Sequence, residues 1–255
     1  VSGAHNIFQA DGYLYVIGAS GYNMHILDLS NPAQPEEVGG WNGEYLHDVY
    51  VRGDYAYGCG IYSSTMYIID ISDQTNPFTV TSWSYSGAAH ACWLSEDGNY
   101  LITADETSGG HIKIWDVSDF GNINMVSEWM ADGGQNESVH NVFVRDNYIY
   151  ASHYVFGLQV IDITDPYNPV LAGYYDTYPG SGGLYEGAWG AYPFTESCYT
   201  YISDMNGGLF VVHFAGCAGA DDDDPRPPDN FSAYSDYTLP ESVNLTWEDP
   251  TELHG

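Results

Sequence analysis

Positive charge is what this sequence lacks most. Its 255 residues contain four Lys and Arg against 35 Asp and Glu, which gives a formal net charge of −31 at pH 7. A surface of this sign repels nucleic acids and anionic membranes, so we expect neither as a partner. The charge suits a saline or divalent-rich medium or a basic partner, and it predicts a fold that salt or calcium stabilises.

Long apolar runs and catalytic signatures are also missing. No stretch of about 18 apolar residues occurs, so we expect no membrane insertion. The sequence contains no GxSxG, HExxH or P-loop motif and no DxDxDG calcium loop. The common serine hydrolase, zinc protease and nucleotide-binding classes are therefore without support, and no motif requires a cofactor.

What the sequence does contain is an internal repeat. An apolar strand followed by Asp and a turn begins at Met24, Met66, Ile112 and Leu158 and, without its Asp, at Leu209, with a period of 42 to 51 residues. Each repeat comprises four short strands: one that begins with His, one after a Gly/Asp/Asn turn, the apolar strand, and a polar strand that ends in an aromatic residue. This pattern predicts an all-β fold, a β-propeller of four-stranded antiparallel blades with five blades visible.

The fifth repeat lacks an outer strand, because an acidic segment follows Phe214 directly and only four residues precede His5. Three explanations stay open: upstream sequence is missing, the last blade is three-stranded, or another chain supplies the strand. An unpaired strand edge can accept a strand from a neighbouring molecule. The edge of the last blade is therefore a predicted site of self-assembly.

Cysteine is scarce and has no metal-binding spacing. The four residues are Cys59, Cys92, Cys198 and Cys217, and no CxxC or CxxCH pair occurs. Four cysteines allow three pairings. We favour the disulfides 59–92, which joins consecutive repeats, and 198–217, which brackets the last repeat. Disulfides predict an extracellular location, whereas four buried free thiols are the alternative.

Two groups of acidic residues are candidates for a defined role. The recurring Asp of the repeat is expected to accept backbone N–H bonds and fix the turn, at Asp28, Asp70, Asp116 and Asp162. A run in the linker could bind Ca²⁺ or form a solvated tether, at Asp221, Asp222, Asp223 and Asp224. A glycosidase-like carboxylate pair could also arise from Asp105, Glu106 and Asp204.

The recurring histidine is the most informative candidate. Propeller symmetry places equivalent residues in a ring around the axis, and the members of this ring are His5, His47, His90 and His140. In the fifth repeat Glu186 lies near the same position. Imidazole and carboxylate groups suit a transition metal, although one ion could not reach all four imidazoles. Alternatively, each His bonds to the backbone or a carboxylate of the next blade.

The repeat segments, above all LQVIDITDPYNP from Leu158, resemble the LVIVD-repeat family of secreted β-propellers. The segments HACWLSEDGNYLITADE, EGAWGAYP and SDMNGGLFVVHF are similar to bacterial choice-of-anchor B surface proteins. Residues 1–214 carry this resemblance, which implies a secreted or surface-anchored propeller with no established activity and a further N-terminal blade. Residues 215–228 form an acidic Gly/Asp/Pro linker, and residues 229–255 resemble the N-terminal part of a fibronectin type III-like β-sandwich.

The main functional hypothesis is a non-enzymatic propeller on a bacterial surface or outside the cell. It would bind a protein or surface polysaccharide, or form part of an extracellular assembly or filament. One alternative is a hydrolase or lyase with its site in the channel, near His90, His140 and Glu186. The other is a calcium-stabilised adhesin.

Overall fold

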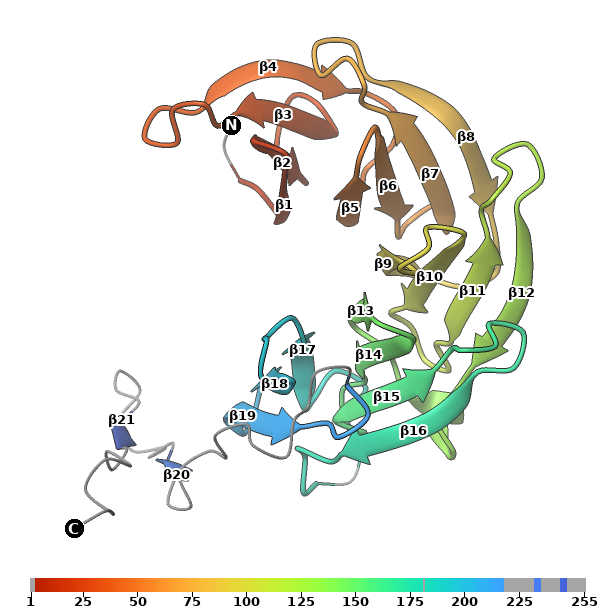
Figure 1. Ribbon diagram of the computed structural model, residues 1–255, viewed down its shortest axis with the longest axis vertical. Coiled ribbons are helices and arrows are strands. Elements are labelled where there is room, and N and C mark those ends of the chain that lie inside the picture. The colour runs from red at the N-terminus through yellow and green to blue at the C-terminus, as the bar shows by residue number, and fades with distance from the viewer. Residues whose placement is uncertain (1–2, 181, 218–231, 235–243, 247–255) are drawn as a thin grey trace.

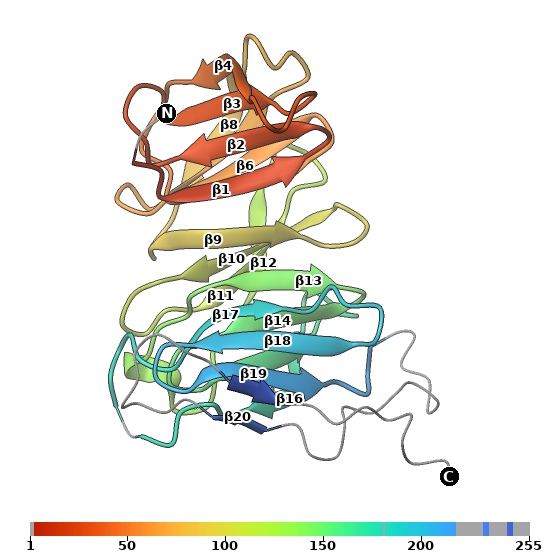
Figure 2. The same cartoon turned by 90° about the vertical axis from the view of Figure 1, so that its left-hand side faces the viewer.

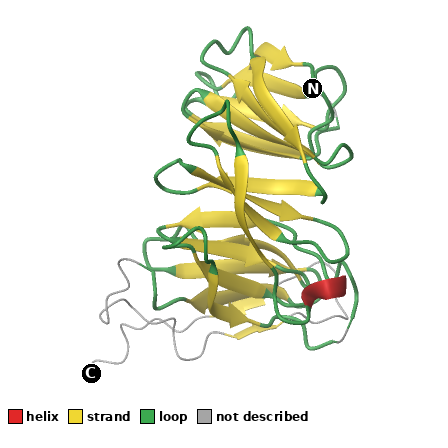
Figure 3. Cartoon of the chain, turned by 90° about the vertical axis from the view of Figure 1, so that its right-hand side faces the viewer, coloured by secondary structure: helices red, strands yellow, loops and turns green. Residues whose placement is uncertain are grey.

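The computed structural model describes residues 3–180, 182–217, 232–234 and 244–246. Strands dominate these residues, and the one helical element among them is a 3₁₀ turn, η1 (Gly134–Asn136), which is red in Figure 3. None of the described residues belongs to a helix long and apolar enough to cross a membrane. The predicted all-β class is confirmed.

Strands β1 to β19 form five antiparallel sheets, each a meander in chain order. The first two blades contain β1 (Asn6–Ala10), β2 (Tyr13–Ile17), β3 (Met24–Asp28), β4 (Glu36–Trp41), β5 (Asp48–Arg52), β6 (Tyr55–Gly60), β7 (Thr65–Asp70) and β8 (Phe78–Ser84). The remaining blades contain β9 (Ala89–Leu94), β10 (Tyr100–Asp105), β11 (Ile112–Asp116), β12 (Asn124–Trp129), β13 (Val142–Arg145), β14 (Tyr148–Ser152), β15 (Leu158–Asp162), β16 (Val170–Tyr175), β17 (Ala188–Tyr192), β18 (Tyr199–Asp204) and β19 (Gly208–His213).

The blades follow an open arc around a common channel (Figure 1). The first strand of each blade, from β1 through β5, β9 and β13 to β17, faces the channel, and the fourth strand lies at the periphery. Figure 2 views the arc from its open side, where the inner strands lie one above another. The predicted propeller is confirmed. Among the described residues the fifth blade has three strands, β17–β18–β19, as its sequence indicates.

Tight hairpins connect the first two strands of blades one, two and four, as the Gly/Asp/Asn turns predict, whereas longer loops join β9 to β10 and β17 to β18. At the β1–β2 turn, Asp11 and Gly12 both have a positive φ, 48° and 84°. Such angles match the twist of a two-residue hairpin, and only Gly, Asn and Asp adopt them at little cost. The hairpin register therefore places the first residue of the inner strand opposite the end of the second strand.

The hydrophobic core lies between neighbouring blades. Four clusters of buried side chains fill the successive blade interfaces. The third strand of each of the first four blades is mostly buried, because sheets pack on both of its faces; β11, for example, is buried from Ile112 to Trp115. This explains why the repeated strand is apolar on both faces.

The recurring Asp has the predicted structural role. The Oδ1 atom of each one accepts a hydrogen bond from the backbone N–H two residues later, over 2.6 Å for Asp28, 2.9 Å for Asp70, 3.0 Å for Asp116 and 2.8 Å for Asp162. These bonds close the turn that leads to the fourth strand. They also lower the pKa of Asp28, because they stabilise the ionised carboxylate.

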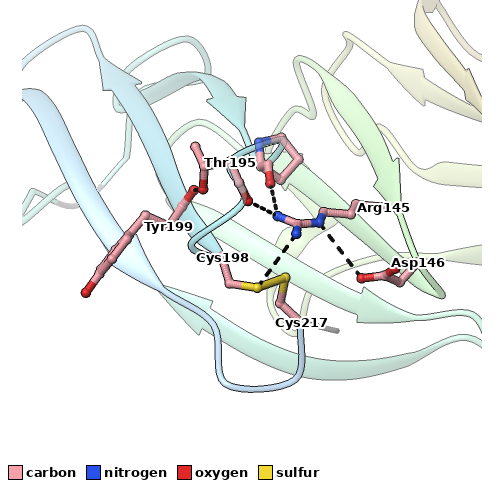
Figure 4. Close-up of a disulfide and its surroundings, with 7 residues drawn as sticks. Arg145, Asp146, Thr195, Cys198, Tyr199 and Cys217 are labelled. Atoms are coloured by element: carbon pink, nitrogen blue, oxygen red, sulfur yellow. Dashed lines mark hydrogen bonds and ion pairs between the residues drawn. A yellow bond between two sulfur atoms is a disulfide. The ribbon is translucent and has the colours of Figure 1, made fainter. Parts of the chain in front are cut away.

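Scarce cations clamp blades together. Arg52, at the end of β5, donates to the carbonyl oxygens of Ser95 (2.8 Å) and Glu96 (2.7 Å) in the next blade. Arg145, at the end of β13, donates to the carbonyls of Pro193 and Thr195, both at 2.6 Å. Figure 4 shows this second guanidinium reaching across to blade five. Two of the four Lys and Arg residues in the chain thus join neighbouring blades.

One of the two predicted disulfides is present. Cys198 and Cys217 are bonded across the last blade (Figure 4), and Arg145 lies beside the bond. Cys59 and Cys92 are instead free thiols buried in the core between blades two and three. The predicted 59–92 disulfide is therefore wrong: the apolar interface accommodates both thiols as small hydrophobic side chains.

Beyond the propeller, β20 (Ser232–Tyr234) and β21 (Asn244–Thr246) pair antiparallel. Asp221 to Asp224 lie outside the described residues, so binding of calcium there stays a prediction.

The arginine clamp generates a prediction. Replacing Arg145 with Met removes two charge-assisted hydrogen bonds and leaves two carbonyls unpaired, so the free energy of unfolding should fall by about 1.5–3 kcal/mol. Urea unfolding measures this decrease. The experiment is done in high salt, because salt screens the change in overall charge repulsion that any loss of a cation causes. Arg145→Lys is the matched control and should lose less, because it keeps the charge without the fork geometry. Equal stability of Arg145→Met and wild type would refute the clamp.

Candidate functional site

A row of aromatic rings lines one end of the channel. Successive ring centroids are 4.1 Å apart for His5 and His47, 4.4 Å for His47 and His90, and 4.3 Å for His90 and His140. Trp189 continues the row, 4.0 Å from His140. We call these five residues the His row. Each blade contributes one member, at or near the start of its inner strand.

The hairpins hold the row in place. The backbone N–H of His5 donates to the carbonyl of Ile17 at the end of β2, over 2.9 Å. His47 makes the equivalent bond to Cys59 over 2.7 Å. The repeated hairpin register therefore sets the height of each ring in the channel.

Glu106 is the acidic partner of the row. It follows β10 directly, and its backbone N–H donates to the carbonyl of Ala88 over 3.1 Å. Its Oε1 atom accepts a hydrogen bond from the Tyr154 hydroxyl, and its Oε2 atom lies 3.4 Å from Nε2 of His90. The Tyr154 hydrogen bond thus fixes Oε1 of Glu106 and leaves Oε2 facing His90.

Glu186 does not join the ring, contrary to the prediction. Its Oε2 atom accepts a hydrogen bond from Asn206 over 2.7 Å, and Trp189 takes the fifth place instead. The sequence did contain a signal: Val139–His140–Asn141–Val142 aligns with Ala188–Trp189–Gly190–Ala191. Matching on charge, rather than on the flanking apolar residues, shifted the prediction by three positions.

The predicted carboxylate pair is divided among separate sites. Asp105 forms a buried ion pair with Lys113 and accepts a hydrogen bond from the Tyr85 hydroxyl over 2.9 Å. Asp204 accepts a hydrogen bond from Thr177 in blade five. Glu106 alone reaches the channel, so a two-carboxylate glycosidase arrangement of these residues is absent.

Burial keeps three members of the His row, His47, His90 and His140, uncharged at neutral pH. Burial lowers the pKa of His47 to about 4 and that of His90 to about 2, and repulsion from neighbouring imidazoles adds to the effect. Burial also lowers the pKa of His140 to about 4, although its Nδ1 atom bonds to the carbonyl of Trp189. Burial raises the pKa of Glu106, against the opposing effect of the Tyr154 hydrogen bond. Uncharged imidazoles at neutral pH are able to bind metal ions.

Several buried polar atoms in the His row and beside it have no hydrogen-bond partner. The Nδ1 atoms of His47 and His90 make no hydrogen bond, and neither does Oδ1 of Asn141. His90 is only 3% exposed. His47, His90 and Glu106 each offer one ligand atom, and these atoms lie within 4.8 Å of one another. This trio could hold a metal ion.

Two adjoining cavities give the row access to a ligand. The polar cavity, of about 220 Å³, is lined by the His row with Glu106, Asn6 and Asn141. The aromatic cavity, of about 430 Å³, also contains Asn6 and Asn141, and its other lining residues are Ile7, Phe8, Asp48, Val49, Tyr50, Cys92, Trp93, Val142, Phe143, Tyr192 and Phe194. The two asparagines therefore mark the junction of the cavities.

Asp48 is the carboxylate of the aromatic cavity. Its Oδ1 atom accepts hydrogen bonds from Nδ2 of Asn6 (2.7 Å) and from the backbone N–H of Val49 (2.8 Å). Burial raises the pKa of Asp48 to about 7, although both hydrogen bonds oppose the shift. Asp48 directly follows His47, so it could have been found by reading one residue past each predicted ring member.

Comparison with known proteins identifies the repeats. The LVIVD repeat model matches residues 3–42, 44–84 and 137–177, which correspond to blades one, two and four. The chain thus contains LVIVD repeats, as the resemblance implies. A search of curated proteins finds no match.

Solved structures share the fold at low identity. A Lactobacillus plantarum protein has a TM-score of 0.66 and 14% identity, covering 82% of this chain and 70% of its own. A putative 6-phosphogluconolactonase from Bacteroides fragilis has a TM-score of 0.61 and 12% identity, covering 81% and 68%. The periplasmic gluconolactonase of Pseudomonas aeruginosa has a TM-score of 0.61 and 11% identity, covering 78% and 62%.

These neighbours correct the main functional hypothesis. The sequence favoured a non-enzymatic binding or structural module, but the similar structures include proteins named as lactonases. That finding contradicts the non-enzymatic hypothesis and supports the alternative of a hydrolase with a channel site. The sequence favoured a non-enzymatic module because the family it resembles has no established activity, its last blade has an open edge, and it contains no linear catalytic motif.

A buried histidine outside the row generates a pH prediction. His153 is fully buried with neither ring nitrogen bonded, and burial lowers its pKa from 6.5 to about 4. The folded state thus binds fewer protons than the unfolded state, so its contribution to stability is intact above about pH 6.5 and is lost as pH falls. When the pH falls from 7.5 to 4, the free energy of unfolding of wild type should decrease by roughly 3 kcal/mol more than that of His153→Phe.

Urea unfolding at both pH values measures this difference. Any constant cost of the Phe side chain cancels when each protein is compared with itself across pH. Identical pH slopes for the two proteins would show that burial of His153 does not suppress its protonation.

Proposed function

We propose that this LVIVD-repeat propeller is an extracellular hydrolase that opens uncharged lactones in its channel. The observation that carries the proposal is the junction of the aromatic and polar cavities at Asn6 and Asn141. Small-molecule sites typically combine apolar walls with a few convergent polar groups, and this junction offers both. The lactonase names of the structural neighbours support this class of chemistry.

The charge distribution favours a neutral substrate. No Lys or Arg is among the described residues that line either cavity. Arg52 and Arg145 are bonded to carbonyls, and Lys113 is paired with Asp105. A phosphorylated lactone would meet no cation there, and the net charge of −31 would repel it. The buried Oδ1 of Asn141, which has no partner, suits a substrate hydroxyl as donor.

The proposed reaction consumes one lactone and one water and yields one hydroxy acid. Asp48 accepts a proton from the water while the oxygen atom of that water attacks the carbonyl carbon of the lactone. The bond between that carbon and the ring oxygen then breaks, and the ring oxygen takes up the proton to become a hydroxyl. An imidazole N–H of the His row can stabilise the charge that develops on the carbonyl oxygen. The ionised acid is repelled by the acidic protein, which favours release.

An extracellular location fits several features together. The Cys198–Cys217 disulfide persists in oxidising compartments, and the LVIVD repeats resemble those of secreted propellers. The finer resemblance to choice-of-anchor B surface proteins stays a prediction, as does the fibronectin-like module. A net charge of −31 is compatible with a saline medium.

Asp48→Asn tests the proposal. If Asp48 accepts the proton, kcat for gluconolactone should fall by about 10²–10⁴-fold with little change in KM. Rates are measured by acid release after subtraction of spontaneous hydrolysis. Asp54→Asn, an exposed carboxylate in the same blade, is the matched control and should keep wild-type kinetics.

Substrate charge provides a second comparison. The wild type should hydrolyse gluconolactone with a higher kcat/KM than 6-phosphogluconolactone. Hydrolysis no faster than the uncatalysed rate for both compounds would reject the proposal, and so would an Asp48→Asn variant with unchanged kcat. Thermal melting of both variants separates loss of chemistry from loss of fold.

A further inference from the structure

We infer that His47, His90 and Glu106 form a binding site for one divalent transition-metal ion of the zinc type. The three ligand atoms come from different places: the start of β5, the strand β9, and the segment that follows β10. The propeller brings them within 4.8 Å of one another. The site goes beyond the proposed hydrolase, because it stands whether or not the channel opens a lactone.

The separation of His90 and Glu106 fits a shared ion better than a hydrogen bond. Nε2 of His90 and Oε2 of Glu106 are 3.4 Å apart, beyond the usual N–H···O range of about 2.7–3.2 Å. Two donors that each lie about 2.0–2.1 Å from a tetrahedral ion are separated by roughly 3.3 Å. The pair therefore already has the spacing of two ligands of one ion.

Unpartnered nitrogen atoms provide an independent observation. His90 is only 3% exposed, yet its Nδ1 atom has no hydrogen-bond partner. Nδ1 of His47 has none either. Buried polar groups in native proteins are nearly always satisfied. Nε2 is the His90 atom that faces Glu106, so the ion would bind that nitrogen, and an ion bound by Nδ1 of His47 would give that atom the partner that the protein alone does not supply.

Glu106 is oriented as a ligand by a neighbour. The Tyr154 hydroxyl donates to Oε1, which leaves Oε2 directed at His90. Tyr154 itself is fully buried and its backbone φ is +39°, an unusual angle for a residue other than glycine. Ligating carboxylates are commonly held by such a second hydrogen bond, which fixes the direction of the free oxygen.

The donor set selects the class of ion. Two imidazoles and one carboxylate match the ligands of catalytic Zn²⁺ sites and of related first-row ions. Ca²⁺ and Mg²⁺ prefer oxygen ligands alone. The adjoining cavity leaves room for water at the remaining coordination positions, and the net charge of −31 concentrates cations around the protein.

Binding of Co²⁺ to chelator-treated protein tests the site directly. Visible absorption of Co²⁺ reports inner-sphere ligands and not the acidic surface. One ion per chain should bind, Zn²⁺ should displace it, and millimolar Ca²⁺ should not. His90→Ala and Glu106→Gln should each weaken binding by more than roughly 100-fold, and Tyr154→Phe, which only orients Glu106, by about 10–100-fold.

The matched control is His111→Ala. His111, which is half-buried, and the exposed Glu128 form a pair whose nitrogen and oxygen lie 3.0 Å apart, without a second imidazole, so this variant should bind Co²⁺ like wild type. Melting curves of the metal-free variants identify any that fail to fold. If His90→Ala is one of them, the Co²⁺ affinities of the conservative variants Glu106→Gln and Tyr154→Phe test the site. Absence of an inner-sphere spectrum in wild type, or unchanged affinity in Glu106→Gln, would overturn the site. Neither readout depends on hydrolysis.

Discussion

The contact between successive inner strands is the constraint on which this molecule depends. Each blade begins with a ring that packs at a tilted angle against the ring of the next blade, from His5 to Trp189. Behind this row, apolar clusters fill each interface between sheets. The burial that stabilises the blades also removes water from the imidazoles. Packing and site chemistry therefore share one cause, and a change in blade spacing would alter both.

The few cations of this strongly acidic chain have structural roles. The structure uses Arg52, Lys113 and Arg145 within the fold, in two clamps between blades and one buried ion pair. The lining of both cavities, as far as the structure describes it, consequently contains carboxylates, amides, imidazoles and aromatic rings without a cation. Such a channel repels anions and attracts metal ions. The same charge distribution therefore favours both the neutral substrate and the metal site.

Much of the fold could be predicted because each blade repeats the same local rules. The Asp-led turns at Asp28 and Asp70, the short hairpins and the doubly buried third strand follow from residue type and period. The site was harder to predict than the fold. The repeat predicts equivalent residues in every blade, whereas the site depends on residues that differ from one blade to the next. Glu106 has no counterpart in the other repeats, and Trp189 replaces a histidine. The Cys59–Cys92 pairing failed because spacing along the chain does not reveal whether two thiols meet in a bonding geometry.

The claim at the centre of this account is that blade packing holds uncharged imidazoles in contact inside the channel. Long-range ¹H–¹⁵N NMR of the metal-free protein, with assigned His47, His90 and His140 signals, measures their protonation directly. The account predicts neutral rings from pH 7 down to about pH 5, since burial lowers all three pKa values to about 4 or below. Titration of these rings near pH 6.5, as for histidine in water, would contradict it.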